Sequence, residues 1–164
     1  MILLRILLIP FILSFYVGNP FLKSNEEAVY SFKTASGKKV MLARDKEGKY
    51  LVYRFGTKDS VEFEYPSSYT DSWSKFNYSF YLRGGGPSNS GMDLNYVYFV
   101  NGGYEYVIYD TYFAEEERSA IGIKVIDLKT KKTTDIKGVL KSKVGTLINF
   151  RDSKELKNGD ETFD

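Results

Sequence analysis

The chain contains no cysteine and no histidine, and the two absences exclude most of the chemistry that proteins perform near neutral pH. Without cysteine there is no disulfide framework, no thiolate zinc site, no Fe–S cluster and no thiol nucleophile. Without histidine there is no Ser-His-Asp triad and no histidine-ligated metal. A hydrolase built from carboxylates and a calcium site remain open. We therefore expect a protein that is not an enzyme, with no catalytic residue, no metal and no cofactor.

An excess of charge of one sign is also missing. The 23 lysines and arginines nearly balance the 21 aspartates and glutamates, and a net charge of +2 gives no case for a nucleic-acid partner. Tryptophan occurs once, whereas there are fourteen tyrosines and twelve phenylalanines, which suit pleated sheet surfaces better than helices. With 43% hydrophobic residues in 164, the composition predicts one globular domain.

Residues 1–19 have the composition of a secretory signal peptide. Arg5 precedes an apolar run from Ile6 to Ile12 that continues through Val17, which is short for a membrane span. Pro10 and the lack of a polar face argue against an amphipathic helix. The segment predicts a periplasmic or secreted protein. Cleavage after Ser14 or after Gly18 and retention as an N-terminal anchor remain alternatives, and only a retained segment would bring the protein to a membrane.

The rest of the chain is predicted to be a linker (20–28), a single β domain (29–150) and a charged tail (151–164). From Val29 to Tyr65, apolar and polar residues alternate between short turns that contain Gly37, Gly48 and Gly56. This period of two indicates strands with one buried face. Segments with helical periodicity are absent beyond the leader. The pattern predicts an all-β, antiparallel small barrel or sandwich of about eight to ten short strands.

The stretch Phe76–Asp110 holds the candidate site. Its strand-like runs are separated by the turn signal Asn101-Gly102-Gly103 and by a longer break, Gly84–Gly91, that no two-residue hairpin needs. Three consecutive glycines there cost about 0.5–1 kcal/mol each relative to alanine. The break is therefore either a bend in the sheet or a loop whose backbone approaches a partner. The predicted partner-binding residues are Ser88, Asn89, Ser90, Gly91, Asp93 and Tyr96.

Two features resemble a known family. The segment SGKKVMLARDKEGKYLVYRFG near the start of the domain, and a loop with Ser90-Gly91 between central strands, are similar to small periplasmic β-barrel inhibitors of lysozyme from bacteria. In that family a Ser-Gly-x-x-Tyr loop inserts into the lysozyme cleft. Here Tyr96 follows Ser90 at a longer spacing. The resemblance implies an exported inhibitor acting through Gly84–Asp93, with a lysozyme as its protein partner.

Other interpretations of the same sequence remain. The first alternative is a structural or envelope-associated protein with no specific ligand, in which the fold itself is what matters. Asp93, Glu105 and Asp110 are the carboxylates that a glycan hydrolase would use. Basic residues are frequent late in the chain, where they either protect a sheet edge or contact an anionic envelope glycan: Lys124, Lys129, Lys131, Lys132, Lys137, Lys141 and Lys143. Tyrosines of the central stretch offer a stacking platform for sugars or a protein.

Overall fold

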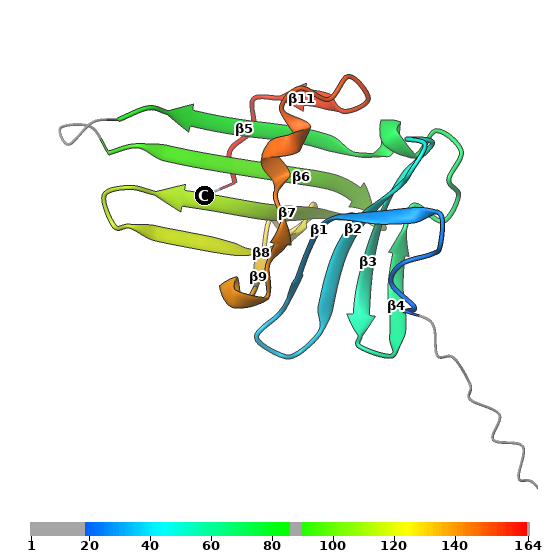
Figure 1. Cartoon of the computed structure of the whole chain (residues 1–164). Helices are drawn as coiled ribbons and strands as arrows, with labels where there is room; N and C mark the ends of the chain where they lie inside the picture. Colours follow the sequence, from blue (N-terminus) through cyan, green and yellow to red (C-terminus); the bar gives the residue numbers. More distant parts are fainter. Residues whose placement is uncertain (1–18, 86–89, 164) are drawn as a thin grey trace, which may run out of the picture.

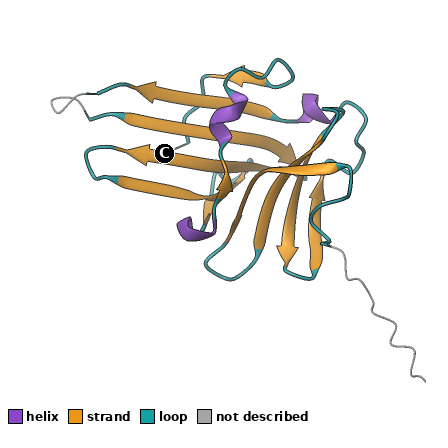
Figure 2. Cartoon of the chain, in the orientation of Figure 1, coloured by secondary structure: helices purple, strands orange, loops and turns teal. Residues whose placement is uncertain are grey.

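The alternating pattern folds into short strands joined by tight turns and brief 3₁₀ helices, as a computed structural model shows for residues 19–85 and 90–163 (Figure 2). The elements in chain order are β1 (Glu26–Lys33), β2 (Lys39–Asp45), β3 (Leu51–Thr57), β4 (Ser60–Tyr65), η1 (Ser72–Lys75), β5 (Asn77–Arg83), β6 (Met92–Asn101), β7 (Tyr104–Phe113), β8 (Arg118–Asp127), β9 (Thr133–Lys137), η2 (Leu140–Ser142), β10 (Val144–Gly145), η3 (Leu147–Phe150) and β11 (Lys157–Gly159). The all-β prediction is confirmed.

Two sheets form the two layers of a sandwich that does not close into a barrel. The first has the order β10-β1-β2-β3-β4, and the second has the order β11-β5-β6-β7-β8-β9. Neighbouring strands are antiparallel, except that β11 runs parallel to β5. Figure 1 shows the strands of the second sheet crossing those of the first at a steep angle. The strands from β1 to β4 and those from β5 to β9 pair with their neighbours in the chain, as the short connections within each series predict.

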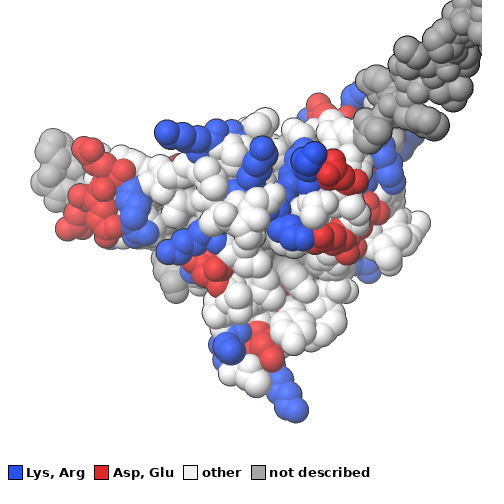
Figure 3. Space-filling view, turned by 90° about the horizontal axis from the view of Figure 1, so that it is seen from below, with Lys and Arg blue, Asp and Glu red and all other residues white. Residues whose placement is uncertain are grey.

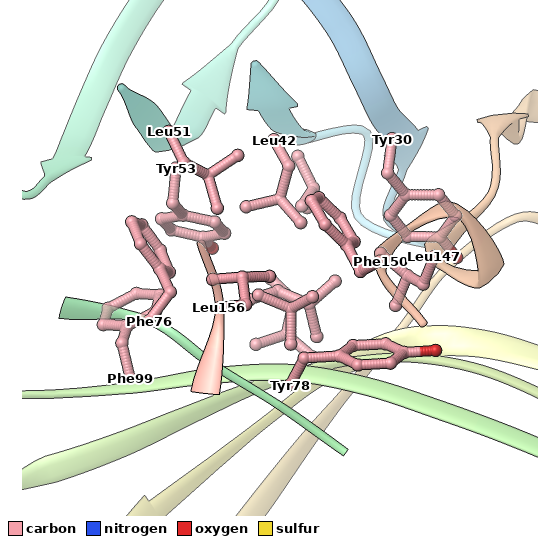
Figure 4. Close-up of a cluster of buried hydrophobic side chains, with 14 of the residues drawn as sticks. Tyr30, Leu42, Leu51, Tyr53, Phe76, Tyr78, Phe99, Leu147, Phe150 and Leu156 are labelled. Atoms are coloured by element: carbon pink, nitrogen blue, oxygen red, sulfur yellow. The ribbon is translucent and has the colours of Figure 1, made fainter. Parts of the chain in front are cut away.

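The core lies between the two sheets and is rich in aromatic rings (Figure 4). Phe99 of β6 is central: Tyr65 stacks on it at 4.1 Å between ring centroids, and Tyr106 stacks at 5.0 Å. Phe76 meets the same ring edge-on at 5.4 Å. Aromatic pairs of this kind contribute about 0.5–1.5 kcal/mol each beyond their buried area. The many aromatics thus fasten one sheet to the other.

The second sheet is longer than the first. Strands β6, β7 and β8 have 10 residues each, whereas β2 and β3 have 7. At about 3.3 Å per residue, the difference amounts to roughly 10 Å. Figure 1 shows the far ends of β5–β8 projecting past the first sheet. We call this projecting part, residues 80–85, 90–95 and 110–121, the overhang.

A buried arginine organises the outer face of the first sheet. Arg54 of β3 is 1% exposed, and all five of its N–H donors are used. Nη1 and Nη2 donate to the two carboxylate oxygens of Glu26 at 2.5 and 2.8 Å, and Nε donates to Glu64 at 2.6 Å. The other two donors reach the Phe21 carbonyl oxygen and the Tyr69 hydroxyl. The network therefore ties the start of the domain to three strands.

The start of the domain differs from the sequence expectation. Strand β1 begins at Glu26, inside the range 20–28 that was expected to be a linker, and Phe21 is fully buried against the outer face of the first sheet. All of the expected leader except Asn19 lies outside the described residues. Across 19–85 and 90–163, no helix has the length and apolar character needed to cross a membrane.

Replacing Arg54 by methionine should strongly destabilise the protein, because Glu26 then stays buried without a counter-charge. Loss of one partner of a buried ion pair costs about 3–5 kcal/mol. Urea titration should show a fall of this size in the free energy of unfolding. Arg44→Met is the matched control, since Arg44 pairs with Glu27 at the surface and exposed pairs contribute at most about 1 kcal/mol. Equal losses in the two variants would contradict the prediction.

The same network predicts a loss of stability in acid. Burial alone would raise the pKa of Glu26, but hydrogen bonds from Arg54 and from the Lys23 backbone outweigh it and hold that pKa below the ordinary value. A lowered folded-state pKa contributes stability above the unfolded value, about 4.3, that is lost as the pH falls through the folded value. The stability difference between wild type and Glu26→Gln should therefore shrink between about pH 7 and pH 3. A constant difference in urea titrations would argue against it.

Candidate functional site

The predicted loop lies at the end of the overhang, and its described residues are held from two sides. Ser88 and Asn89 are outside the described residues. Arg83 of β5 donates from Nε to the Ser90 carbonyl oxygen at 2.8 Å and from Nη2 to the Ser90 hydroxyl at 3.2 Å. The Gly91 carbonyl oxygen accepts a hydrogen bond from the backbone of Ala114, in the turn between β7 and β8. These hydrogen bonds attach Ser90 and Gly91 to β5 and to the turn between β7 and β8, and we call the two residues the loop base.

The glycine at the entrance of this loop is not required by the local backbone. Gly84 has no positive φ, and a Cβ placed on it would meet no atom within 4 Å. Both usual reasons for glycine, a left-handed conformation and a close contact inside the protein, are thus missing at this position. The described part of the chain therefore gives no structural reason for glycine at this position.

Asp93 and Tyr96 lie on opposite faces of the second sheet. They are three residues apart on β6, and successive side chains of a strand alternate between faces. Asp93 is on the inner face, which continues the core toward the overhang. Tyr96 is on the outer face, is 1% exposed and packs against the ring of Phe163 at 5.3 Å. The structure therefore does not bring these two predicted residues together.

On the inner face, Asp93 belongs to a polar cluster that sequence reasoning missed. Arg151, which follows η3, forms an ion pair with Asp93 and donates to Asn95 Oδ1 at 2.9 Å. Asn95 Nδ2 donates to Asp93 at 2.6 Å. The Tyr78 hydroxyl donates to Asn95 Oδ1 at 2.7 Å, and burial raises the pKa of Tyr78 to about 12, so it remains a donor. Arg151 is in the segment 151–164, which was expected to be a charged tail. Nothing in the local sequence pattern indicated that it would contact Asp93 and Asn95.

The carboxylates proposed for a glycan hydrolase do not form one group. Asp110 is on the inner face and binds Lys143 Nζ at 3.0 and 3.1 Å. Glu105 is an odd number of residues away on the same strand, β7, and therefore faces the outer side. Asp93 and Asp110 are each compensated by a cation, Arg151 or Lys143. These ion pairs hold the connector that carries η2, β10 and η3 onto the sheet.

Exposed apolar side chains surround this polar cluster. Phe80 is 40% exposed, Leu82 56%, Tyr112 42% and Ile148 42%. Leu82 and Tyr112 flank Asp93 on the two neighbouring strands, and Phe80 lies opposite Asn95. The sequence alternation predicted a buried face for Phe80 and Leu82, but the first sheet does not extend far enough to cover them. We call this surface, made by Phe80, Leu82, Tyr112 and Ile148, the inner overhang face.

The end of the overhang also carries an acidic cluster. Glu115, Glu116 and Glu117 are exposed in the turn between β7 and β8. Figure 3 shows red side chains gathered at this end of the molecule, whereas charges of both signs are mixed elsewhere on that face. Arg118 pairs with Glu116 at 2.6 Å, but no ion pair joins Glu115 or Glu117 to another described residue.

The Asp93–Arg151 pair should couple the connector to the overhang. A double-mutant cycle with Asp93→Asn and Arg151→Gln, followed by urea unfolding, should give a coupling energy of about 1–2 kcal/mol. The pair Lys38–Glu62, both of which are more exposed, serves as the comparison and should give less than about 1 kcal/mol. Coupling no larger than that of Lys38–Glu62 would show that the cluster does not fasten the connector.

Comparison of the chain with protein-family models, with curated proteins and with solved structures found no match in any of the three. The functional argument therefore starts from the geometry of the overhang. That geometry combines a rigid sheet end, a loop with a fixed base, an exposed apolar surface and an acidic turn.

Proposed function

We propose that the protein is an exported, non-catalytic binding protein that recognises a protein partner through the inner overhang face. The observation that carries the proposal is the group of four exposed apolar side chains around a polar cluster whose charges are already compensated. Aromatic and aliphatic side chains of this kind are typical anchors of protein interfaces, where they are desolvated on binding. The apolar composition of residues 1–19 supports the export part of the proposal.

Preorganisation supports this surface as a docking site. Tyr112 is on a strand paired on both sides, Phe80 and Leu82 are paired with β6, and Arg151 lies over the ring of Phe80 at 5.0 Å. Side chains held in this way lose little conformational entropy when a partner binds. The ion pairs of Asp93 and Asp110 leave no uncompensated carboxylate on the inner overhang face, which would otherwise cost affinity on desolvation.

The charge at the end of the overhang indicates the kind of partner. Glu115 and Glu117 lie beside the loop base and are not neutralised by described residues. We therefore expect a partner with a basic surface next to an apolar patch. The concrete form of the proposal is a lysozyme inhibitor. The described residues at the base of the loop Gly84–Asp93 lie at the end of the overhang, and the loop is the part proposed to enter the lysozyme cleft.

Inhibition assays test this function. The purified full chain should slow the lysis of cell walls by a c-, g- or i-type lysozyme. Leu82→Asp places a charge on the inner overhang face and should weaken inhibition at least about tenfold, equivalent to about 1.4 kcal/mol. Val100→Asp is the matched control, since Val100 is similarly exposed at the opposite end of β6 and should leave inhibition unchanged.

Two further measurements complete the test. Circular dichroism and urea unfolding establish that both variants fold. Replacing residues 85–91 by an Asn-Gly turn should abolish inhibition if the loop enters the cleft. Absence of inhibition and of binding with all three lysozyme classes would remove the inhibitor proposal, and equal effects of Leu82→Asp and Val100→Asp would remove the inner overhang face as its site.

A further inference from the structure

The opposite face of the second sheet carries a groove of about 430 Å³ over β7, β8 and β9. Its shape follows from the outward side chains of β8, where the small residues Ala120 and Gly122 lie between Arg118 and Lys124. The small side chains in the middle of β8 and the long cationic side chains toward its ends leave a hollow above the middle of the strand. The volume is within the range of sites for small ligands, roughly 300–1,000 Å³.

One wall of the groove is fixed by an aromatic ring over a glycine. A Cβ on Gly122 would lie 2.4 Å from the Tyr109 hydroxyl oxygen, so the ring occupies the space that any side chain would need. The Tyr109 hydroxyl donates to Asp135 of β9 at 2.9 Å. Tyr109 is itself largely buried, so its position does not depend on a ligand. The glycine, which weakens a strand interior, is thus explained by the groove wall.

The groove has an excess of positive charge. Arg118, Lys124 and Lys137 line it together with the carboxylate of Asp135, and Arg118 is already paired with Glu116. Lys124 Nζ lies 5.9 Å from the centroid of the Tyr109 ring and donates to the Phe163 carbonyl oxygen, which is neutral. No ion pair joins Lys124 or Lys137 to another residue of the described chain. Lys124 lies opposite Asp135 on β9, and Lys137 has no ion pair with a described residue, so the groove keeps a net positive charge.

The C-terminal segment forms the boundary of this groove. The Phe163 ring packs against Tyr96, which also lines the groove, and against Tyr98 at 5.0 Å. The Tyr98 hydroxyl donates to Glu161 at 2.6 Å. The segment therefore covers the neighbouring part of the outer face and leaves the hollow over Ala120 open.

We propose that this groove binds an acidic sugar unit, a pyranose ring that carries a carboxylate, within a longer glycan. The cations recognise the carboxylate, and the apolar hollow over Ala120 accepts the ring's C–H face. Asp135 accepts hydrogen bonds from ring hydroxyls through its remaining lone pairs. The site is on the face opposite to the inner overhang face, so it is independent of the protein-binding surface.

Calorimetric titration of the purified full chain with a trimer of galacturonic acid tests this inference. The trimer should bind with a measurable affinity, and the neutral galactose trimer should bind at least tenfold more weakly. Lys137→Glu reverses one groove charge and should lower affinity at least tenfold. Ala120→Leu fills the hollow without changing the charge and should lower affinity by a similar factor.

Lys58→Glu is the control, because it makes the same change of charge at an exposed turn of the first sheet and should leave affinity unchanged. Urea unfolding of each variant identifies any loss of fold, and Lys137→Glu tests the site if Ala120→Leu does not fold. The proposal is overturned if the acidic trimer does not bind, if the neutral trimer binds equally well, or if Lys58→Glu weakens binding as much as Lys137→Glu.

Discussion

The buried contact between Arg54 and Glu26 is the constraint on which the first sheet depends. Removing two charges from water is costly, and the cost is met here only because every donor of the guanidinium has an acceptor. The acceptors come from the segment before β1, from β1 itself, from β4 and from the loop that contains Tyr69. Such a network favours one arrangement over others, because any shift of β1 along its neighbour would leave a buried charge unpaired.

A fixed first sheet sets the limits of the core and thereby creates the overhang. The aromatic residues around Phe99 fill the space where the sheets overlap. Beyond that region the longer strands of the second sheet continue with the same alternation, but no partner sheet covers them. The result is an apolar surface that belongs to the sheet but faces solvent. The connector bearing Arg151 and Lys143 covers only part of it and supplies the counter-charges that the inner carboxylates need.

The sequence predicted what depends on local pattern. Alternation and turn glycines located the meander and the central hairpins, and the all-β class followed from them. The pattern did not show where one sheet stops covering the other, since Phe80 and Leu82 alternate in the same way as fully buried residues. The local pattern also did not predict contacts between segments that are far apart in the chain. Phe21 and Phe163 are in segments that look like a linker and a charged tail, yet each packs on a sheet face. Arg151 reaches Asp93 across 58 positions of the chain.

Both proposed sites follow from the period of two on the same strands. Along β7, Asp110 and Tyr112 face inward, whereas Tyr109 and Thr111 face outward, so each strand contributes to both surfaces. The inner surface is apolar with compensated charges, which suits a protein partner that excludes water. The outer groove has more cations than carboxylates among the described residues, which suits a small anionic group. One sheet extended beyond its partner therefore presents two chemically different surfaces.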